Sequence, residues 1–418
     1  MIRDKKPRFF YGYVILVASL GIQGIIWGIF NSFGVFFMPL QAEFGWSKAM
    51  ISAAVSFSML LHGLVAIIMG GLNDRFGPKL IMAICGLFFG LGHLLMSQLN
   101  AAWQLYLFFS VLVGIGISAT DVVLLSTIAR WFVKKRGLMS GIVKAGTGMG
   151  LMIMPLVASK LISASSWRTS YIILGILALV FAIPIAQLLR RDPGQMGQLP
   201  DGEKEVTISS LDSVERGLSL GQAIHTKQFW IICGVYFTIC SCVQTILVHI
   251  VPYATDLGIS ATNAASILST IGGASIAGRL VMGSAGDSVG NKRAMLVCFL
   301  ILVAILCWLQ WAKELWMLYL FAVAYGFSHG GFFALISPMA AELFGTRSHG
   351  AIFGIVIFSG TIGSAISPIL AGHIFDITYS YWLAFLTLTA LSIIGLILTI
   401  LIRPTNDKGG GNDSRRST

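Results

Sequence analysis

The stretch GGLNDRFGPK at residues 70–79 recurs as GSAGDSVGNK at residues 283–292, and this pair decides the fold. Each copy is a short polar turn between two long apolar runs, with glycines around an aspartate and a lysine at its end. Glycine permits a tight turn, and an aspartate at a helix N-terminus can accept the free backbone N–H groups there. The two copies predict the same helix–turn–helix unit in each half of the chain.

The distance between the two turns, 213 residues, superposes much of the chain on itself. The segment WQLYLF at 103–108 falls on WMLYLF at 316–321, and the glycines and proline of 137–155 fall on those of 350–368. One register held over five apolar runs indicates an internal duplication. Six spans in each copy would give both halves the same topology, as in transporters with a substrate site between two repeats.

The composition is that of a membrane protein. Of the 418 residues, 56% are hydrophobic and 11% are charged, whereas soluble domains carry about 25% charged residues. Since a helix needs about 20 apolar residues to cross a bilayer, we predict an all-α membrane protein with 12 transmembrane helices in two six-helix bundles related by pseudo-two-fold symmetry. The predicted spans are 11–38, 48–72, 79–98, 103–128, 137–162, 168–190, 228–252, 261–286, 292–312, 315–340, 348–373 and 379–402.

The spans divide the chain into four parts. We expect an N-terminal bundle at 1–191, a cytoplasmic linker at 192–227, a C-terminal bundle at 228–403 and a disordered cytoplasmic tail at 404–418. With both termini on one side, that side holds 22 of the 28 Lys and Arg residues, the other side holds 4, and 2 lie inside spans. Because basic residues stay in the cytoplasm, both termini are predicted to be cytoplasmic in a multi-pass protein of the cell membrane. The net charge of +11 then needs no nucleic-acid partner.

Three charged residues lie deep inside predicted spans, away from the span ends: Arg279, Asp121 and Lys144. A charge at the centre of a bilayer costs about 2.5–3.5 kcal/mol even on the mildest scale, so such residues generally mark functional sites. The repeat places Ala66 opposite Arg279, and the counterparts of the other two are also apolar. Duplication of the scaffold therefore does not explain these charges.

At about 1.5 Å per helical residue, all three charges lie roughly 10–14 Å from the cytoplasmic ends of their spans. We expect Asp121 and Lys144 to neutralise each other on adjacent helices, while Arg279 faces them across a cavity and binds a substrate carboxylate through two parallel bonds. Three interpretations of Asp121 and Lys144 stay open. They form a purely structural pair, they titrate and couple transport to a proton, or one of the helices presents a different face and they do not meet. For Arg279, the alternative to substrate binding is a structural ion pair.

Further polar residues in the spans are candidate substrate contacts. His329 and His249 could bind substrate or relay a proton, with a hydrogen-bonded core histidine as the alternative, and Tyr325 lies one turn from His329. Asn31 falls on Gln244 under the repeat, and Gln23 is a third amide in a span. We expect His62 and His93 to be packing residues.

The sequence predicts neither a metal site nor a cofactor. Six cysteines all fall within predicted spans, at spacings that suit neither zinc nor a disulfide framework. No HExxH motif is present. We therefore do not expect an enzyme.

The turn at 70–79, with its echo at 283–292, resembles the signature loop of the major facilitator superfamily. That resemblance implies a gating role for Gly70, Asp74, Arg75, Gly77 and Asp287. A narrower resemblance lies in WFVKKRGLMSGIVKAG at 131–146, in span 1 and in the Arg279 helix, which are similar to monocarboxylate transporters; bacterial oxalate/formate carriers share these features. This implies that Arg279 is the arginine that binds the substrate carboxylate.

The chain also departs from these families. Animal monocarboxylate transporters have an aspartate where Ser275 stands and a lysine where we align Asn31. Oxalate carriers place a second cation in span 11, and 350–372 contains no Lys or Arg.

We predict a secondary active transporter that moves small monocarboxylates, such as lactate or pyruvate, by proton symport and alternating access. The expected partners are the carboxylate, a proton as co-substrate and the lipid bilayer, and we expect a monomer to be functional. The alternative is an oxalate/formate-like or other organic-anion antiporter, because Arg279 and Lys144 together would suit a dicarboxylate.

Overall fold

The computed structural model describes residues 9–46, 48–202 and 217–403, and in these residues the regular structure is helical, with no strand. Twelve helices are long and apolar enough to cross a membrane, which confirms the predicted spans. The first half contains α1 (Gly12–Asn31), α2 (Phe33–Phe44), α3 (Lys48–Phe76), α4 (Pro78–Met96), α5 (Ala102–Leu105), the π-helical η1 (Tyr106–Val113), α6 (Gly114–Trp131), α7 (Arg136–Ala164) and α8 (Trp167–Ala186).

The second half contains α11 (Lys227–Asp256), α12 (Ala261–Val289), α13 (Asn291–Leu309), α14 (Leu315–Phe344), α15 (His349–Thr378) and α16 (Trp382–Leu401). Between the halves lie the short helices η2 (Pro193–Met196), η3 (Pro200–Gly202) and α10 (Leu220–Ile224). The tail predicted at 404–418 and the middle of the linker lie outside the described residues.

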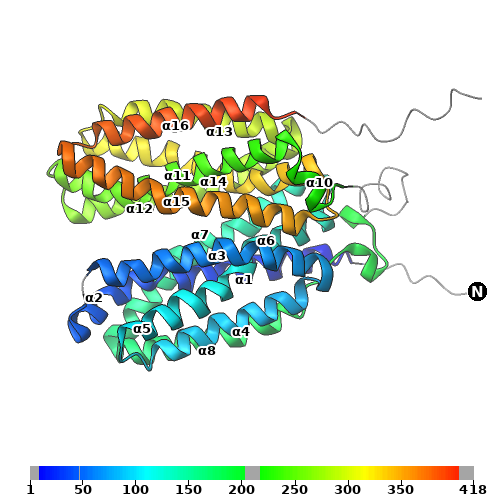
Figure 1. Ribbon diagram of the computed structural model, residues 1–418, viewed down its shortest axis with the longest axis horizontal. Coiled ribbons are helices and arrows are strands. Elements are labelled where there is room, and N and C mark those ends of the chain that lie inside the picture. The colour runs from blue at the N-terminus through cyan, green and yellow to red at the C-terminus, as the bar shows by residue number, and fades with distance from the viewer. Residues whose placement is uncertain (1–8, 47, 203–216, 404–418) are drawn as a thin grey trace, which may run out of the picture.

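Two bundles lie side by side along their length (Figure 1). They meet where α7 packs on α12 and where α3 packs on α15. These two contacts are equivalent under the 213-residue repeat, because α3 corresponds to α12 and α7 to α15. The structure therefore has the pseudo-two-fold arrangement that the repeat predicts.

The two signature turns connect α3 to α4 and α12 to α13. Gly77 has a φ of 84° and Gly290 a φ of 95°, in a region that only glycine enters without strain. Pro78 starts α4, where its missing N–H leaves no bond unmade. Both copies of the motif thus reverse the chain at the same place in their half, at the end of the molecule that carries most of the described basic loop residues. We call this the basic end.

The bundles touch backbone to backbone at the basic end. A Cβ at Gly137 would overlap the carbonyl of Gly283, and a Cβ at Gly70 would overlap the backbone of Gly350. Small residues allow helices to approach this closely. The central space is therefore closed at the basic end.

Toward the opposite end the same helices separate. On α7, Gly148 still contacts Ile276 of α12, but Leu151 and Met152, one turn further on, are 45% and 57% exposed. On α12, a Cβ at Gly272 would meet nothing within 4 Å. The contact between α3 and α15 also loosens in this direction. Gly63 packs on Thr361, but Ile369, two turns further along α15, is 72% exposed. The two bundles thus pack less closely toward the end opposite the basic one, which we call the open end.

The ends of the linker brace two equivalent turns at the basic end. The Asp201 carboxylate accepts hydrogen bonds from the backbone N–H groups of Val133 and Lys134, in the turn between α6 and α7. The backbone N–H of Leu218 donates to the carbonyl of Phe344, in the turn between α14 and α15. One linker therefore contacts both halves beside the closed end.

We expect Gly70→Ala to force α3 and α15 apart at the basic end and to depopulate the state seen here. Overpacking a close contact costs about 1–3 kcal/mol, which corresponds to a roughly 5- to 150-fold shift between two states. The shift would appear as slower maleimide labelling of a cysteine placed at Leu151, in a chain whose native cysteines are replaced. Gly71→Ala is the matched control, since a Cβ there meets nothing within 4 Å. Equal labelling of the two variants would contradict the prediction.

Candidate functional site

A buried ion pair lies in the first half at the level where the bundles separate. Lys144 Nζ of α7 is 2.7 Å from Asp121 Oδ1 of α6, and both side chains are under 10% exposed. Gln23 of α1 donates to the same carboxylate oxygen at 2.6 Å and to the hydroxyl of Thr147 at 3.0 Å. The expected contact between Asp121 and Lys144 is present, and the role of the pair in coupling stays a prediction.

Arg279 faces this pair from the second half. Its guanidinium is buried against Gly148 of α7, and its Nη1 donates to the hydroxyl of Ser275, one turn earlier on α12, at 3.0 Å. Its Nε is buried and has no hydrogen-bond partner in the part of the chain that the structure describes. Asp121 is close enough to attract Arg279 electrostatically, while Arg279 and Lys144 repel each other. Within the described residues no carboxylate forms a salt bridge with Arg279, so two cations share one carboxylate.

Aromatic rings from both halves flank Lys144. Its Nζ lies 5.8 Å from the ring centroid of Trp27 on α1 and 5.5 Å from that of Phe333 on α14. Aromatic faces attract a cation at this distance. The ammonium is therefore held between the two bundles.

Predicted residues on α14 take different positions. The His329 ring centroid lies 5.3 Å from that of Phe333, and the charges of Arg279 and Lys144 act on the ring. Its Nδ1 is buried and has no partner among the described residues. Tyr325 is fully buried, and its hydroxyl donates to the carbonyl of Val243 on α11 at 3.1 Å. His329 thus belongs to the charged centre, whereas the hydroxyl of Tyr325 ties α14 to α11.

The other predicted contacts lie further from the ion pair. The ring nitrogens of His249 bond to the hydroxyl of Tyr381 at 3.3 Å and to the carbonyl of Pro368 at 3.0 Å, so this side chain links α11 to α15. Asn31 is exposed, and its amide donates to the carbonyl of Trp27. Gln244 is partly exposed on α11. Substrate contact remains a prediction for all of these residues.

Several residues at the centre were not expected from the sequence. His62 of α3, expected as a packing residue, lies with its ring 5.8 Å from that of Trp27, and the charges of Asp121 and Lys144 act on it. It lies about ten residues from the basic end of its span, so the depth argument applied to the charged residues would have found it. Trp27 and Phe333 carry no comparable signal, because an aromatic residue in a span is ordinarily packing.

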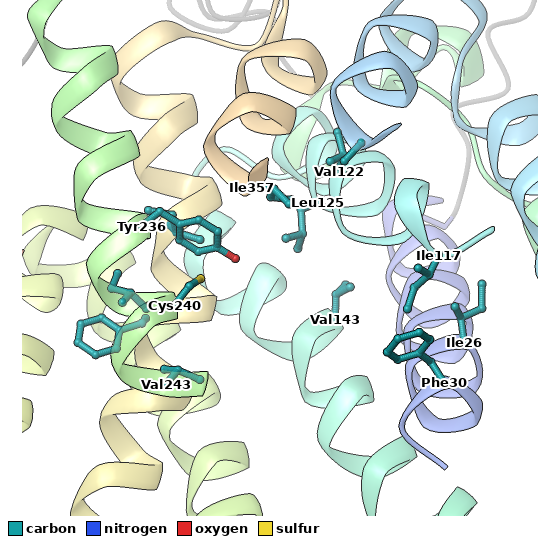
Figure 2. Close-up of a cluster of buried hydrophobic side chains, with 14 of the residues drawn as sticks. Ile26, Phe30, Ile117, Val122, Leu125, Val143, Tyr236, Cys240, Val243 and Ile357 are labelled. Atoms are coloured by element: carbon teal, nitrogen blue, oxygen red, sulfur yellow. The ribbon is translucent and has the colours of Figure 1, made fainter. Parts of the chain in front are cut away.

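The wall on the α11 side also went unforeseen. Figure 2 shows the hydroxyl of Tyr236 and the thiol of Cys240 pointing from α11 into the space between the halves, opposite Val143 of α7. Both residues are at least 94% buried. The centre is thus a charged cluster with an apolar and weakly polar wall.

The aspartates of the signature turns cross between the halves. Asp287 accepts hydrogen bonds from the backbone N–H groups of Gly137 at 2.6 Å and Leu138 at 2.8 Å, at the N-terminus of α7. Asp74 accepts from the N–H of Ala351, at the N-terminus of α15, at 3.2 Å. Each carboxylate lies at the positive end of a helix dipole in the other bundle, which is a favourable placement.

Two arginines at the basic end differ from the prediction. Arg130 was not predicted as a gating residue but contacts Asp74, whereas Arg75 was predicted as one and contacts a ring of its own helix. Arg130 of α6 forms a 2.6 Å salt bridge with Asp74 and also donates to the carbonyl of Thr346. Arg75 instead lies over the ring of Phe76, with 5.2 Å between the guanidinium carbon and the ring centroid. Arg130 had been assigned to topology alone, as one of the basic loop residues.

Two equivalent six-helix bundles, a charged centre open at one end and a hydrogen-bonded gate at the other define a membrane transporter. The chain belongs to the Major Facilitator Superfamily, whose family model matches it in two overlapping segments, residues 16–281 and 238–417. Its relatives and structural neighbours are membrane transporters, and the protein is a transporter rather than an enzyme.

Two relatives match nearly the whole chain. It is 26% identical to the oxalate:formate antiporter of Oxalobacter formigenes, over 95% of this chain and 92% of the relative. It is also 26% identical to monocarboxylate transporter 12 of Mus musculus, over 94% of this chain and 84% of the relative.

Solved structures share the fold. The human organic anion transporter MFSD10 superposes with a TM-score of 0.73 at 13% identity, over 93% of this chain and 99% of that one. The transporter FucP, solved in an outward conformation, superposes with a TM-score of 0.70 at 15% identity, over the same shares.

Proposed function

We propose that this protein carries small monocarboxylates across the cell membrane by proton symport and alternating access. The observation that carries the proposal is Arg279, whose buried guanidinium has no carboxylate partner and whose Nε makes no hydrogen bond within the described chain. A buried cation without a partner is costly. An anionic substrate would supply the missing charge and the missing acceptor.

The names of the relatives point to the same class of substrate. One is named for oxalate and formate, another for monocarboxylates, and a structural neighbour for organic anions. The rings of Trp27 and Phe333, both near Lys144, would give the carbon chain of a small acid an apolar surface beside the cations. A single carboxylate on Arg279 would balance the two cations and one carboxylate at the centre.

Coupling would use the Asp121–Lys144 pair. Neutralising Asp121 would release the ammonium of Lys144, which lies at 2.7 Å from it, to act together with Arg279 on the substrate. The substrate anion and the proton would then cross together without net charge, as in electroneutral symport. The Asp74 and Asp287 contacts would open at the basic end as the opposite end closes.

The orientation follows from charge. The basic end would face the cytoplasm because Lys and Arg are retained there, which places both termini inside and the open end outside. All the residues of the proposed site come from one chain, so we propose that a monomer transports.

The test is uptake of radiolabelled acids into proteoliposomes that contain the purified protein. An inward proton gradient is expected to drive accumulation of lactate or pyruvate without any anion trapped inside. Empty liposomes correct for passive entry of the undissociated acid. Lack of both gradient-driven uptake and exchange for every small carboxylate would refute the proposed function.

The second candidate is an organic-anion antiporter. It is favoured by two cations, Arg279 and Lys144, that share one carboxylate, since a dicarboxylate could engage both. An antiporter would take up labelled oxalate only when formate or another anion is loaded inside the vesicles. A proton gradient alone would then drive no accumulation.

A further inference from the structure

His62 is a buried imidazole at the transport site whose ring nitrogens both lack a partner. It is 3% exposed, and neither Nδ1 nor Nε2 forms a hydrogen bond with any described residue. Leaving a buried polar group unsatisfied costs about 1–3 kcal/mol. The other buried histidine of the same bundle, His93, bonds through Nδ1 to the carbonyl of Phe89 at 2.8 Å. His62 is therefore not a satisfied packing residue.

The helices around α3 supply the surroundings of His62. From α6 comes Asp121 and from α7 comes Lys144, and these are the charged groups that act on the ring. From α1 comes the indole of Trp27, with 5.8 Å between ring centroids. From α15 comes the hydroxyl of Thr361, packed on the neighbouring Gly63. Asp121 is thus the carboxylate that would stabilise a proton on His62.

The repeat shows that His62 occupies a site position. A shift of 213 residues takes His62 to Ser275, the residue that holds Arg279 at 3.0 Å. The same shift takes the neighbouring Gly63–Thr361 contact onto the Ile276–Gly148 contact, and both contacts are present. His62 therefore stands in the first half where the partner of the anion anchor stands in the second.

The carboxylate whose charge acts on His62 already accepts two hydrogen bonds. Asp121 accepts from Lys144 and from Gln23, and both bonds end on Oδ1. A proton on Oδ1 would have to displace two donors, whereas Oδ2 accepts no hydrogen bond from the described residues. The imidazole of His62, whose nitrogens also lack a partner among these residues, requires no bond to be broken before it accepts a proton.

We propose that His62 is the group that takes up the transported proton and thereby switches the Asp121–Lys144 pair. This inference rests on the proposed function and deepens it. A proton from water at the open end forms an N–H bond on the ring. The imidazolium then draws Asp121 toward itself, Lys144 is freed, and its ammonium joins Arg279 on the substrate carboxylate. After the bundles rock, the N–H proton passes to water at the basic end and the pair closes again.

The proposal is tested by comparing two kinds of transport in one preparation. His62→Gln keeps a polar side chain but cannot carry a proton at physiological pH. The wild type, His62→Gln and the control His93→Gln are reconstituted, with the membrane potential clamped at zero. Lactate counterflow between loaded vesicles measures binding and rocking, and lactate accumulation under a gradient of one pH unit measures coupling, which for one proton per anion reaches about tenfold.

We expect His62→Gln to lose accumulation above the equilibrium ratio of one and to keep a reduced counterflow, because Lys144 stays on Asp121 and Arg279 alone binds the carboxylate. His93→Gln should retain both. Accumulation that persists in His62→Gln would overturn the proposal. If His62→Gln shows no counterflow, His62→Asn is measured in the same way, and loss of counterflow in both variants also overturns it, because the residue would then serve binding or folding. If the wild type itself failed to accumulate lactate, the result would instead refute the proposed proton symport.

Discussion

Arg279→Lys is expected to lower the efficiency of carboxylate uptake by about 10- to 150-fold, the equivalent of a charge-assisted hydrogen bond worth roughly 1.5–3 kcal/mol. Lysine keeps the positive charge but loses the planar fork that binds both oxygens of a carboxylate. It also loses the bond from Nη1 to Ser275, which orients the guanidinium along α12. The measurement is the initial rate of uptake against substrate concentration in proteoliposomes.

The control for this variant is Arg293→Lys, an exposed arginine at the start of α13 on the basic end. Its rate should stay near that of wild type, because that side chain lies far from the centre. If Arg279→Lys transported with unaltered apparent affinity, the guanidinium would not be the carboxylate anchor. The site would then have to be sought around Lys144.

Asp121→Asn and Lys144→Met are each expected to destabilise the protein strongly, and the double variant less than either. Removing one partner of a buried pair leaves an unpaired buried charge and costs about 3–5 kcal/mol, whereas removing both leaves none. Each single variant should therefore unfold at a clearly lower temperature in a detergent thermal melt. The double variant should recover much of this loss and still lack proton-driven transport.

Glu43 and Arg168 form the matched surface pair, at 2.5 Å with side chains 39% and 35% exposed. Glu43→Gln should change stability by no more than about 1 kcal/mol, since water solvates either charge left alone. Additive effects in the Asp121–Lys144 cycle would show that the two charges are not coupled. They would also remove the basis for the proposed switch.

Much of the fold was readable from sequence because the relevant physics is local. A span is recognised by its apolar length, and a duplication by the register of its glycines, prolines and turns. Depth follows from the fixed rise of a helix, which is why Asp121, Lys144 and Arg279 were placed at one level. The break in the first span at Ser32, whose hydroxyl bonds to the carbonyl of Gly28, was not foreseen.

The chemistry at the centre was only partly readable. Charged residues in apolar runs are visible because they are expensive, so the ion pair could be expected. Aromatic rings carry no such cost signal, so Trp27 and Phe333 were not singled out. His62 was expected to be a packing residue, although its depth in the span is that of the three charges. Arg130 was hidden differently, because a basic residue near a span end is already explained by topology.

The sequence by itself determined the number of spans, the two-fold repeat and the depth of the three charges, since each depends on neighbours along one chain segment. Tertiary structure alone decided which side chains meet and which end is closed. Helix rotation places the ring of His62 against that of Trp27, and the glycine contacts of Gly70 with Gly350 and of Gly137 with Gly283 close the basic end. These features arise between helices far apart in the chain, and no local pattern specifies them.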